Sequence, residues 1–324
     1  MQNSALLPLI TAVFFSAMAA PVVAQGYPTK PIRMIIPFPP GGGSDVTGRV
    51  VATALGERLG RQVIVDNRAG AGGVIGSELA ANAPRDGYTL LMVSLAHVVN
   101  PWLYDLKGRY HPIKSFAPVA IIAGSPVVLV VNPSVPVNSV ADLVALAKKQ
   151  PGRLQYASAG VGSVTHLAAE LFKYTARIDM LHVPFKGAGP ATLDVVGGHT
   201  NLLFGGLLAT VPQVRSGKLR ALGVGSLKRN PILPDVPSIA EAGVPGYETV
   251  NWFGLVTPAG TSAAIIERLH REVTAVQGLP DVQKQFDADG ATVLRMSAAR
   301  FGAYMVADMN KWERVVKEGG IKPQ

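Results

Sequence analysis

The chain lacks cysteine altogether. A disulfide framework, a thiolate nucleophile and a cysteine-ligated metal site are therefore impossible, and stability must come from packing. Aromatic residues are also few, at 6% of 324 residues, whereas the hydrophobic share as a whole is 48%. This balance is typical of α/β folds, in which helices pack closely on a sheet.

Long runs of one charge are missing as well, although the formal net charge is +9 and the pI is near 9.8. Lysine and arginine are scattered, with no block of five or more and no aromatic-rich basic stripe. This argues against a nucleic-acid partner, which would need a concentrated basic patch. A diffuse positive field that attracts small anions is the preferred interpretation.

Sequence patterns of catalysis and cofactor binding are equally absent. Ser44 and Ser163 each follow a glycine, but neither stands in the G-x-S-x-G pattern of a hydrolase nucleophile. The glycine-rich segment 70–75 ends in Ile75, where a dinucleotide-binding fingerprint needs glycine. The six histidines show no i, i+4 pair, and no acidic cluster has cation-loop spacing. We therefore expect no enzyme activity, no catalytic residue, no metal site and no cofactor.

The N-terminus has the pattern of an export signal. Residues 5–20 are almost wholly apolar and small residues follow at 22–24, so residues 1–24 are predicted to be a cleaved signal peptide and Gln25 to begin the mature chain. No lysine or arginine precedes the apolar run, which departs from the usual pattern. An uncleaved membrane anchor is the alternative, disfavoured because the run is short and is broken by Pro8 and Pro21. The expected location is the periplasm.

Strand-like and helix-like segments alternate along the mature chain, which indicates mainly parallel sheets with helices on both faces. A length of about 300 residues favours two domains. The predicted strands are 32–38, 62–66, 89–93, 118–123, 127–132, 154–157, 180–184, 201–204, 219–224 and 250–257. The predicted helices are 45–59, 74–83, 139–149, 164–175, 188–197, 208–216, 262–277, 281–288 and 298–318.

Two extended apolar runs, 127–131 and 250–256, are candidates for strands that cross between domains. On that interpretation the first lobe consists of residues 27–125 plus 252–324, and the second lobe is the insert 126–251. A double crossing of this kind forms a hinge.

Two glycine-rich turns stand between a strand and a helix. The first, 39–45, follows the strand 32–38, and the second, 158–163, precedes the helix 164–175. Such turns present free backbone N–H groups at the positive end of a helix dipole, which favours an anion. They also serve tight connections without any ligand. Because ligands of doubly wound sheets bind beyond the carboxyl ends of strands, the two turns predict an acidic small molecule held between the lobes.

A series of ordered motifs makes the resemblance to a known family specific. The chain resembles the Bug family, the extracytoplasmic solute receptors of tripartite tricarboxylate transporters, over the whole mature length. The motifs are YPTKPIR at 27–33, PFPPGGGSD at 37–45, VDNRAGAGG at 65–73, DGYTLL at 86–91, NP at 100–101, FAPV at 116–119, GVGS at 160–163, HVPFKG at 182–187, GKLRAL at 217–222, LPDVP at 233–237 and GYE at 246–248.

The resemblance implies a two-lobed periplasmic binding protein of type II, each lobe a mainly parallel sheet flanked by helices, with two crossover strands between the lobes. It implies a small mono-, di- or tricarboxylate as ligand, membrane permease subunits as partners, and a monomer. An alternative is an exported interaction protein that signals carboxylate occupancy to a membrane sensor.

The resemblance also assigns ligand-binding positions, grouped by loop. They are Phe38, Gly43, Ser44 and Asp45 in the first turn; Ser94 and His97 after the strand 89–93; Ser158, Ala159, Gly162, Ser163 and His166 in the second turn; Lys186 and Gly187 in a third loop; and Gly205 after the apolar run 201–204.

Several of these positions have a structural alternative. Asp45 is also a good helix cap, His97 and His166 are also candidates for packing, and Lys186 for a solvated loop side chain. At Gly205 and Gly206 this chain departs from many family members, which carry an acidic residue there. The missing carboxylate disfavours an amino-acid ligand, because no partner for an ammonium group is provided.

Overall fold

The structure, a computed structural model, describes residues 26–288, 290–318 and 321. The predicted signal peptide, residues 1–24, lies outside the described residues. Among the helices of the described part, none is both long and apolar enough to cross a membrane.

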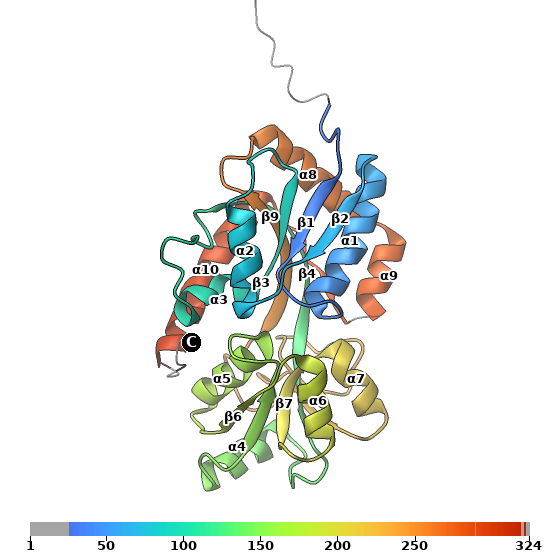
Figure 1. Cartoon of the computed structure of the whole chain (residues 1–324). Coiled ribbons are helices and arrows are strands. Elements are labelled where there is room, and N and C mark those ends of the chain that lie inside the picture. The colour runs from blue at the N-terminus through green and yellow to red at the C-terminus, as the bar shows by residue number, and fades with distance from the viewer. Residues whose placement is uncertain (1–25, 289, 319–320, 322–324) are drawn as a thin grey trace, which may run out of the picture.

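Strands and helices alternate through most of the chain, as the sequence predicts (Figure 1). The strands are β1 Ile32–Ile36, β2 Val63–Asn67, β3 Thr89–Ser94, β4 Phe116–Val131, β5 Gln155–Ser158, β6 Leu181–Pro184, β7 Leu202–Gly206, β8 Arg220–Val224, β9 Val250–Pro258 and β10 Thr292–Val293. The helices are α1 Gly43–Leu59, α2 Val74–Ala81, α3 Leu95–Leu103, α4 Val140–Lys149, α5 Val164–Ala176, α6 Ala188–Val196, α7 Leu207–Arg215, α8 Ala263–Val276, α9 Pro280–Ala288 and α10 Ala298–Glu318, with a 3₁₀ turn at Ala71–Gly73.

The strands form two sheets that share β4. In the upper sheet β2, β1 and β3 are parallel, while β9 lies antiparallel between β3 and the first part of β4. In the lower sheet β6, β5 and β7 are parallel, and the second part of β4 lies antiparallel between β7 and β8. Figure 1 shows the two sheets one above the other, with β4 running between them.

β4 corrects the prediction of two separate strands at 118–123 and 127–132. It is one strand of 16 residues. The sequence Gly124-Ser125-Pro126 resembles a break because proline cannot donate a ladder hydrogen bond. Here Pro126 pairs with Val250, the first residue of β9, at the end of the upper ladder, so the missing N–H costs little.

The set of predicted helices is also incomplete. The segment 95–103 forms α3, which was not predicted because it continues the apolar run of β3 and contains Pro101. Ser238 and Glu241 form a capping contact outside any helix: the Glu241 N–H donates to the Ser238 hydroxyl at 3.1 Å, in a segment that is a turn.

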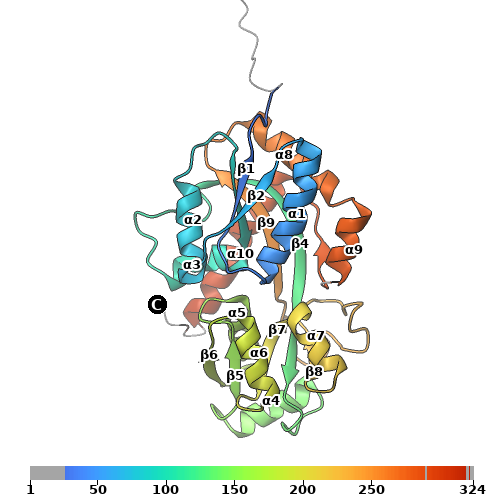
Figure 2. The same cartoon turned by 45° about the vertical axis from the view of Figure 1, so that its right-hand side comes forward.

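Helices cover both faces of each sheet. In the upper lobe α1, α8 and α9 pack together on one face, and α3 packs with α10 on the other. In the lower lobe α6 and α7 lie on one face and α4 and α5 on the other (Figure 2). One buried cluster runs through both lobes and includes Trp252 and Trp312, so the lobes share part of their core.

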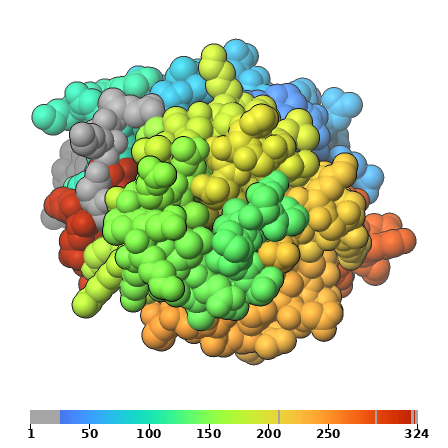
Figure 3. Space-filling view, turned by 90° about the horizontal axis from the view of Figure 1, so that it is seen from below, coloured from blue at the N-terminus to red at the C-terminus, as the bar shows by residue number. Residues whose placement is uncertain are grey.

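Seen from below, the surface is formed mainly by the green, yellow and orange parts of the chain that build the lower lobe (Figure 3).

The division of the chain into 27–125 plus 252–324 and 126–251 follows the two sheets. It stays a prediction for the boundaries of independently moving units.

Gly254, in the middle of β9, has no room for a side chain. A methyl group there would lie 2.3 Å from Phe301 Cζ and 3.0 Å from the Ala120 carbonyl oxygen. Because this is overpacking between a sheet and α10, we expect Gly254→Ala to lower the free energy of unfolding by about 1–3 kcal/mol in urea titrations. Gly189→Ala, where a methyl group meets nothing within 4 Å, is the control. Equal urea midpoints for the two variants would contradict the prediction.

Candidate functional site

The carboxyl ends of the two sets of parallel strands face each other where the lobes meet. β9 is antiparallel to both β3 and β4, so β4 leaves the upper sheet at the edge where β1, β2 and β3 end. β4 is antiparallel to β7, so it enters the lower sheet at the edge where β5, β6 and β7 end. The helices that follow these strands, among them α1, α3, α5 and α7, therefore begin at the junction. Their positive dipole ends converge on it from both sides.

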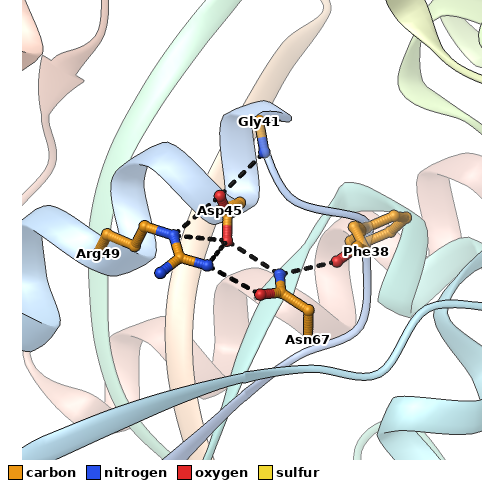
Figure 4. Close-up of polar contacts among 5 residues, drawn as sticks. All are labelled: Phe38, Gly41, Asp45, Arg49 and Asn67. Atoms are coloured by element: carbon orange, nitrogen blue, oxygen red, sulfur yellow. Dashed lines mark hydrogen bonds and ion pairs between the residues drawn. The ribbon is translucent and has the colours of Figure 1, made fainter.

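The first glycine-rich loop is held by a network around Asp45 (Figure 4). The Asp45 carboxylate accepts the Gly41 N–H and the Asn67 side-chain amide, each at 2.9 Å, and forms an ion pair with Arg49 at 3.0 Å. Asn67, at the end of β2, also donates to the Phe38 carbonyl at 3.0 Å. Both ends of the loop are thus fixed before any ligand arrives.

The same contacts keep Asp45 ionised. Burial alone would raise its pKa, but the hydrogen bonds from Arg49, Gly41 and Asn67, with the charge of Arg49, outweigh burial and hold the pKa below the usual range. Its oxygens are engaged inside the protein. The geometry therefore favours the structural alternative for Asp45 over direct ligand contact.

The amides at the start of α1 are open. Within residues 26–288, the N–H groups of Gly42, Gly43 and Ser44 have no hydrogen-bond partner. Gly43 is exposed, and a methyl group on it would come within 3.0 Å of Phe253 Cζ. Consecutive free N–H groups at a helix N-terminus can receive a carboxylate oxygen.

The second loop differs, because its own side chains bind most of its amides. The N–H of Ala159 donates to Thr165 Oγ1 at 2.8 Å, that of Gly160 to Ser158 Oγ at 3.1 Å, and that of Gly162 to His166 Nδ1 at 3.2 Å. The N–H groups of these three residues are therefore engaged within the loop itself.

Ser163 caps α5 as its N-cap residue. Its hydroxyl accepts the His166 N–H at 3.3 Å and donates to the Gly160 carbonyl at 2.6 Å. In the described chain the N–H groups of Val161 and Val164, like that of the buried Thr165, have no partner, so this loop keeps free donors for an anion.

The two lobes touch at Gly162, whose φ of +77° requires glycine. A methyl group on Gly162 would lie 2.9 Å from Leu103 Cδ1 and 3.7 Å from Tyr104 Cε2, both at the end of α3 in the upper lobe. The Tyr104 ring also lies against Gly72, and burial raises the pKa of its phenol. Sequence reasoning missed Tyr104, because α3 itself was not predicted.

Ser94 and His97 are placed by α3. Ser94 is its buried N-cap residue, at the junction edge of β3. His97 is turned into the core, where Nε2 donates to the Pro112 carbonyl at 2.9 Å and Nδ1 lies 3.3 Å from Ser77 Oγ. Burial lowers the pKa of His97 to about 4, so it is neutral. The packing alternative for His97 fits this geometry better than ligand binding.

The remaining predicted positions lie in the lower lobe. Lys186 is exposed, and Gly187 is the N-cap of α6 with a φ of +122°. Gly205 is buried in β7, and a methyl group on it would lie only 2.2 Å from Thr210 Cγ2. Gly206, the N-cap of α7, faces open space. Thr210 thus fills the volume that a side chain at 205 would need.

The described part of the chain contains no group of three or more His, Cys, Asp or Glu residues that could hold a metal ion. What the junction offers is backbone N–H groups on both sides, a donor set suited to an organic anion.

A family model described as the tripartite tricarboxylate transporter family receptor matches residues 47–321. The chain belongs to this receptor family. The family is one of binding receptors rather than enzymes, which confirms the prediction that this receptor is not an enzyme, and the recognition of the family from sequence motifs is confirmed as well.

The receptor is similar along its whole length to known proteins. BugT of Bordetella pertussis is 37% identical over 324 residues, covering 99% of each chain. Rpa4515 of R. palustris, solved with adipate, is 36% identical with a TM-score of 0.84, covering 92% of this chain and 100% of that one. MatC of Rhodopseudomonas palustris, with bound malate, is 30% identical with a TM-score of 0.80, covering 90% and 100%. These structures confirm the predicted fold class.

Removing the charge of Asp45 tests the first-loop network. We expect Asp45→Asn to lower the free energy of unfolding at pH 7 by about 1–3 kcal/mol, the range for buried charge-assisted hydrogen bonds. Because the folded pKa is depressed, this contribution is complete above the unfolded pKa of about 3.9 and is lost as the pH falls through the folded pKa. In urea titrations, the difference in free energy of unfolding between wild type and Asp45→Asn should therefore be smaller at pH 3 than at pH 7.

The matched control is Glu57→Gln, which removes an exposed carboxylate from the same helix and should change stability by less than about 0.5 kcal/mol. The assigned role would be refuted if the difference in free energy of unfolding between wild type and Asp45→Asn were as large at pH 3 as at pH 7.

Proposed function

We propose that the receptor captures a small carboxylate between its two lobes in the periplasm and presents it, as a monomer, to the permease of a tripartite tricarboxylate transporter. The observation that carries the proposal is the unpaired backbone N–H groups of Gly43 and Ser44, at the start of a helix that faces the opposite lobe. Two solved relatives were determined with the dicarboxylates adipate and malate.

The proposed clamp takes N–H donors from both lobes. Gly43 and Ser44 supply them from the upper lobe, and Val161, Val164 and the start of α6 at Gly187 supply them from the lower lobe. A charge-assisted hydrogen bond contributes about 1.5–3 kcal/mol, so two or three of them offset the cost of dehydrating a carboxylate. Because the donors belong to different lobes, the ligand favours the closed arrangement, which a partner can recognise.

The ligand that fits best is a plain carboxylic acid rather than an amino acid. Thr210 occupies the space beside Gly205, and Gly206 leaves its side-chain direction open. Neither position provides a carboxylate for an ammonium group. The open space at Gly206 suits an uncharged or longer part of the acid.

Native mass spectrometry of the freshly purified receptor is the decisive experiment, since a closed binding protein can retain its ligand. We expect a mass increment that corresponds to a small carboxylic acid and disappears after unfolding and refolding. Isothermal titration of the refolded receptor with adipate, malate, aspartate and glutamate should then show binding of the plain dicarboxylates. A clear preference for aspartate or glutamate would overturn the assignment of ligand class.

Gly43→Val tests the first-loop amides. The valine side chain would crowd Phe253 and cover the N–H groups of Gly43 and Ser44. Loss of two charge-assisted hydrogen bonds corresponds to a Kd raised by at least about a hundredfold, measured by titration with the acid that binds wild type. The circular dichroism spectrum should keep its native shape. Wild-type affinity in a folded Gly43→Val variant would remove this loop from the site.

A further inference from the structure

Three aromatic rings are stacked beneath the second loop. Tyr156 of β5 and His182 of β6 have ring centroids 4.8 Å apart, and His182 and His166 of α5 have centroids 4.2 Å apart, with interplanar angles of 12° and 19°. The stack joins three elements that surround the loop. Neither the fold nor the direct ligand contacts proposed above account for two histidines at this place.

Hydrogen bonds fix the protonation of each imidazole. The Gly162 N–H donates to His166 Nδ1 at 3.2 Å, so Nδ1 is an acceptor and the proton of the neutral ring is on Nε2. The buried Ser158 hydroxyl accepts the Gly160 N–H, and its own hydrogen has one acceptor in the described chain, His182 Nε2 at 2.6 Å. The proton of His182 is therefore on Nδ1.

The charged side chains around the stack pair with one another inside the lower lobe. Glu170 accepts the Tyr156 hydroxyl and pairs with Lys173 at 3.0 Å, and Lys173 lies 3.7 Å from Asp179. Burial, with the nearby Lys173, lowers the pKa of His166 to about 4. Burial, the neighbouring His166 and Lys173 lower the pKa of His182 to about 4 against a smaller opposing effect of Glu170. Both rings are neutral acceptors at neutral pH.

Gly162, whose amide His166 holds, is also one of the residues of the lower lobe that meet the upper lobe. Its α-carbon faces Leu103 and Tyr104. A shift of this amide would displace the surface that α3 contacts, together with the neighbouring Val161 and Val164 amides.

We infer that His166 is a positioning residue: supported by the stack with His182 and Tyr156, it fixes Gly162 and thereby the second loop in the conformation that receives the upper lobe and the anion. The part concerning the anion rests on the proposed function. The part concerning the loop does not, and it is measurable without any ligand.

The first test measures tautomers in the wild-type receptor. Long-range ¹H–¹⁵N spectra at pH 7 should show His166 protonated on Nε2 and His182 protonated on Nδ1. The reverse tautomer at His166 would overturn the inference, because Nδ1 would then no longer accept the Gly162 N–H.

The second test uses an isosteric pair of variants. His166→Leu removes the acceptor, whereas His166→Asn places an oxygen where Nδ1 stands. Hydrogen exchange of the Gly162 amide should become about tenfold faster in His166→Leu and should stay near wild type in His166→Asn. His270→Leu, which removes a histidine bound to the Val119 carbonyl in the upper lobe, should leave Gly162 unchanged. Unchanged exchange in folded His166→Leu would refute the role, and the tautomer test remains decisive if that variant does not fold.

Titration with adipate completes the comparison. His166→Leu should raise the Kd about tenfold, and His166→Asn should raise it less than about threefold. If the wild type binds no carboxylate, the proposed function fails while the exchange and tautomer results still decide the positioning role. If adipate binds and His166→Leu has wild-type affinity, the link from the loop to the ligand is refuted.

Discussion

The architecture depends on β4, the one strand that both sheets share. β4 runs in one direction through both sheets. Whether its neighbours in each sheet run parallel or antiparallel to it therefore determines which ends of the strands lie at the junction. Because it runs with β1, β2 and β3 above and against β5, β6 and β7 below, the carboxyl ends of both parallel sets point at the junction. Helices that follow parallel strands must then begin there, and the N–H groups of their first turns converge on the junction.

The two loops reach a similar result with different chemistry. The first is fixed by an ionised network, in which Asp45, Arg49 and Asn67 hold the backbone and leave the following amides open. The second is fixed by neutral groups, in which Ser158 and His166 bind amides of their own loop. Charged and titratable side chains therefore shape the loops from inside, while other backbone N–H groups of the same loops stay without a partner in the described chain.

The sequence predicted the alternation of strands and helices, both glycine-rich loops and the family. It missed the continuity of β4, since Gly124-Ser125-Pro126 locally resembles a turn and only pairing with β9 makes it a strand. It missed α3 because an apolar run without polar interruptions does not show where a strand ends and a buried helix begins. It left Asp45, His97 and His166 open between ligand contact and internal support, because residue type does not reveal which way a side chain turns.

The sequence by itself determined the local chemistry: glycines at positions of positive φ, a helix after each glycine-rich turn, and a chain without thiols or metal-ligand spacing. These features are local, since backbone sterics and helix ends act over a few residues. Only the tertiary structure decided which amides stay free, which histidines become neutral acceptors and which residue of the lower lobe meets Tyr104. Those outcomes depend on side chains distant in sequence that compete for the same N–H groups, and on burial, which exists only once both sheets are assembled around β4.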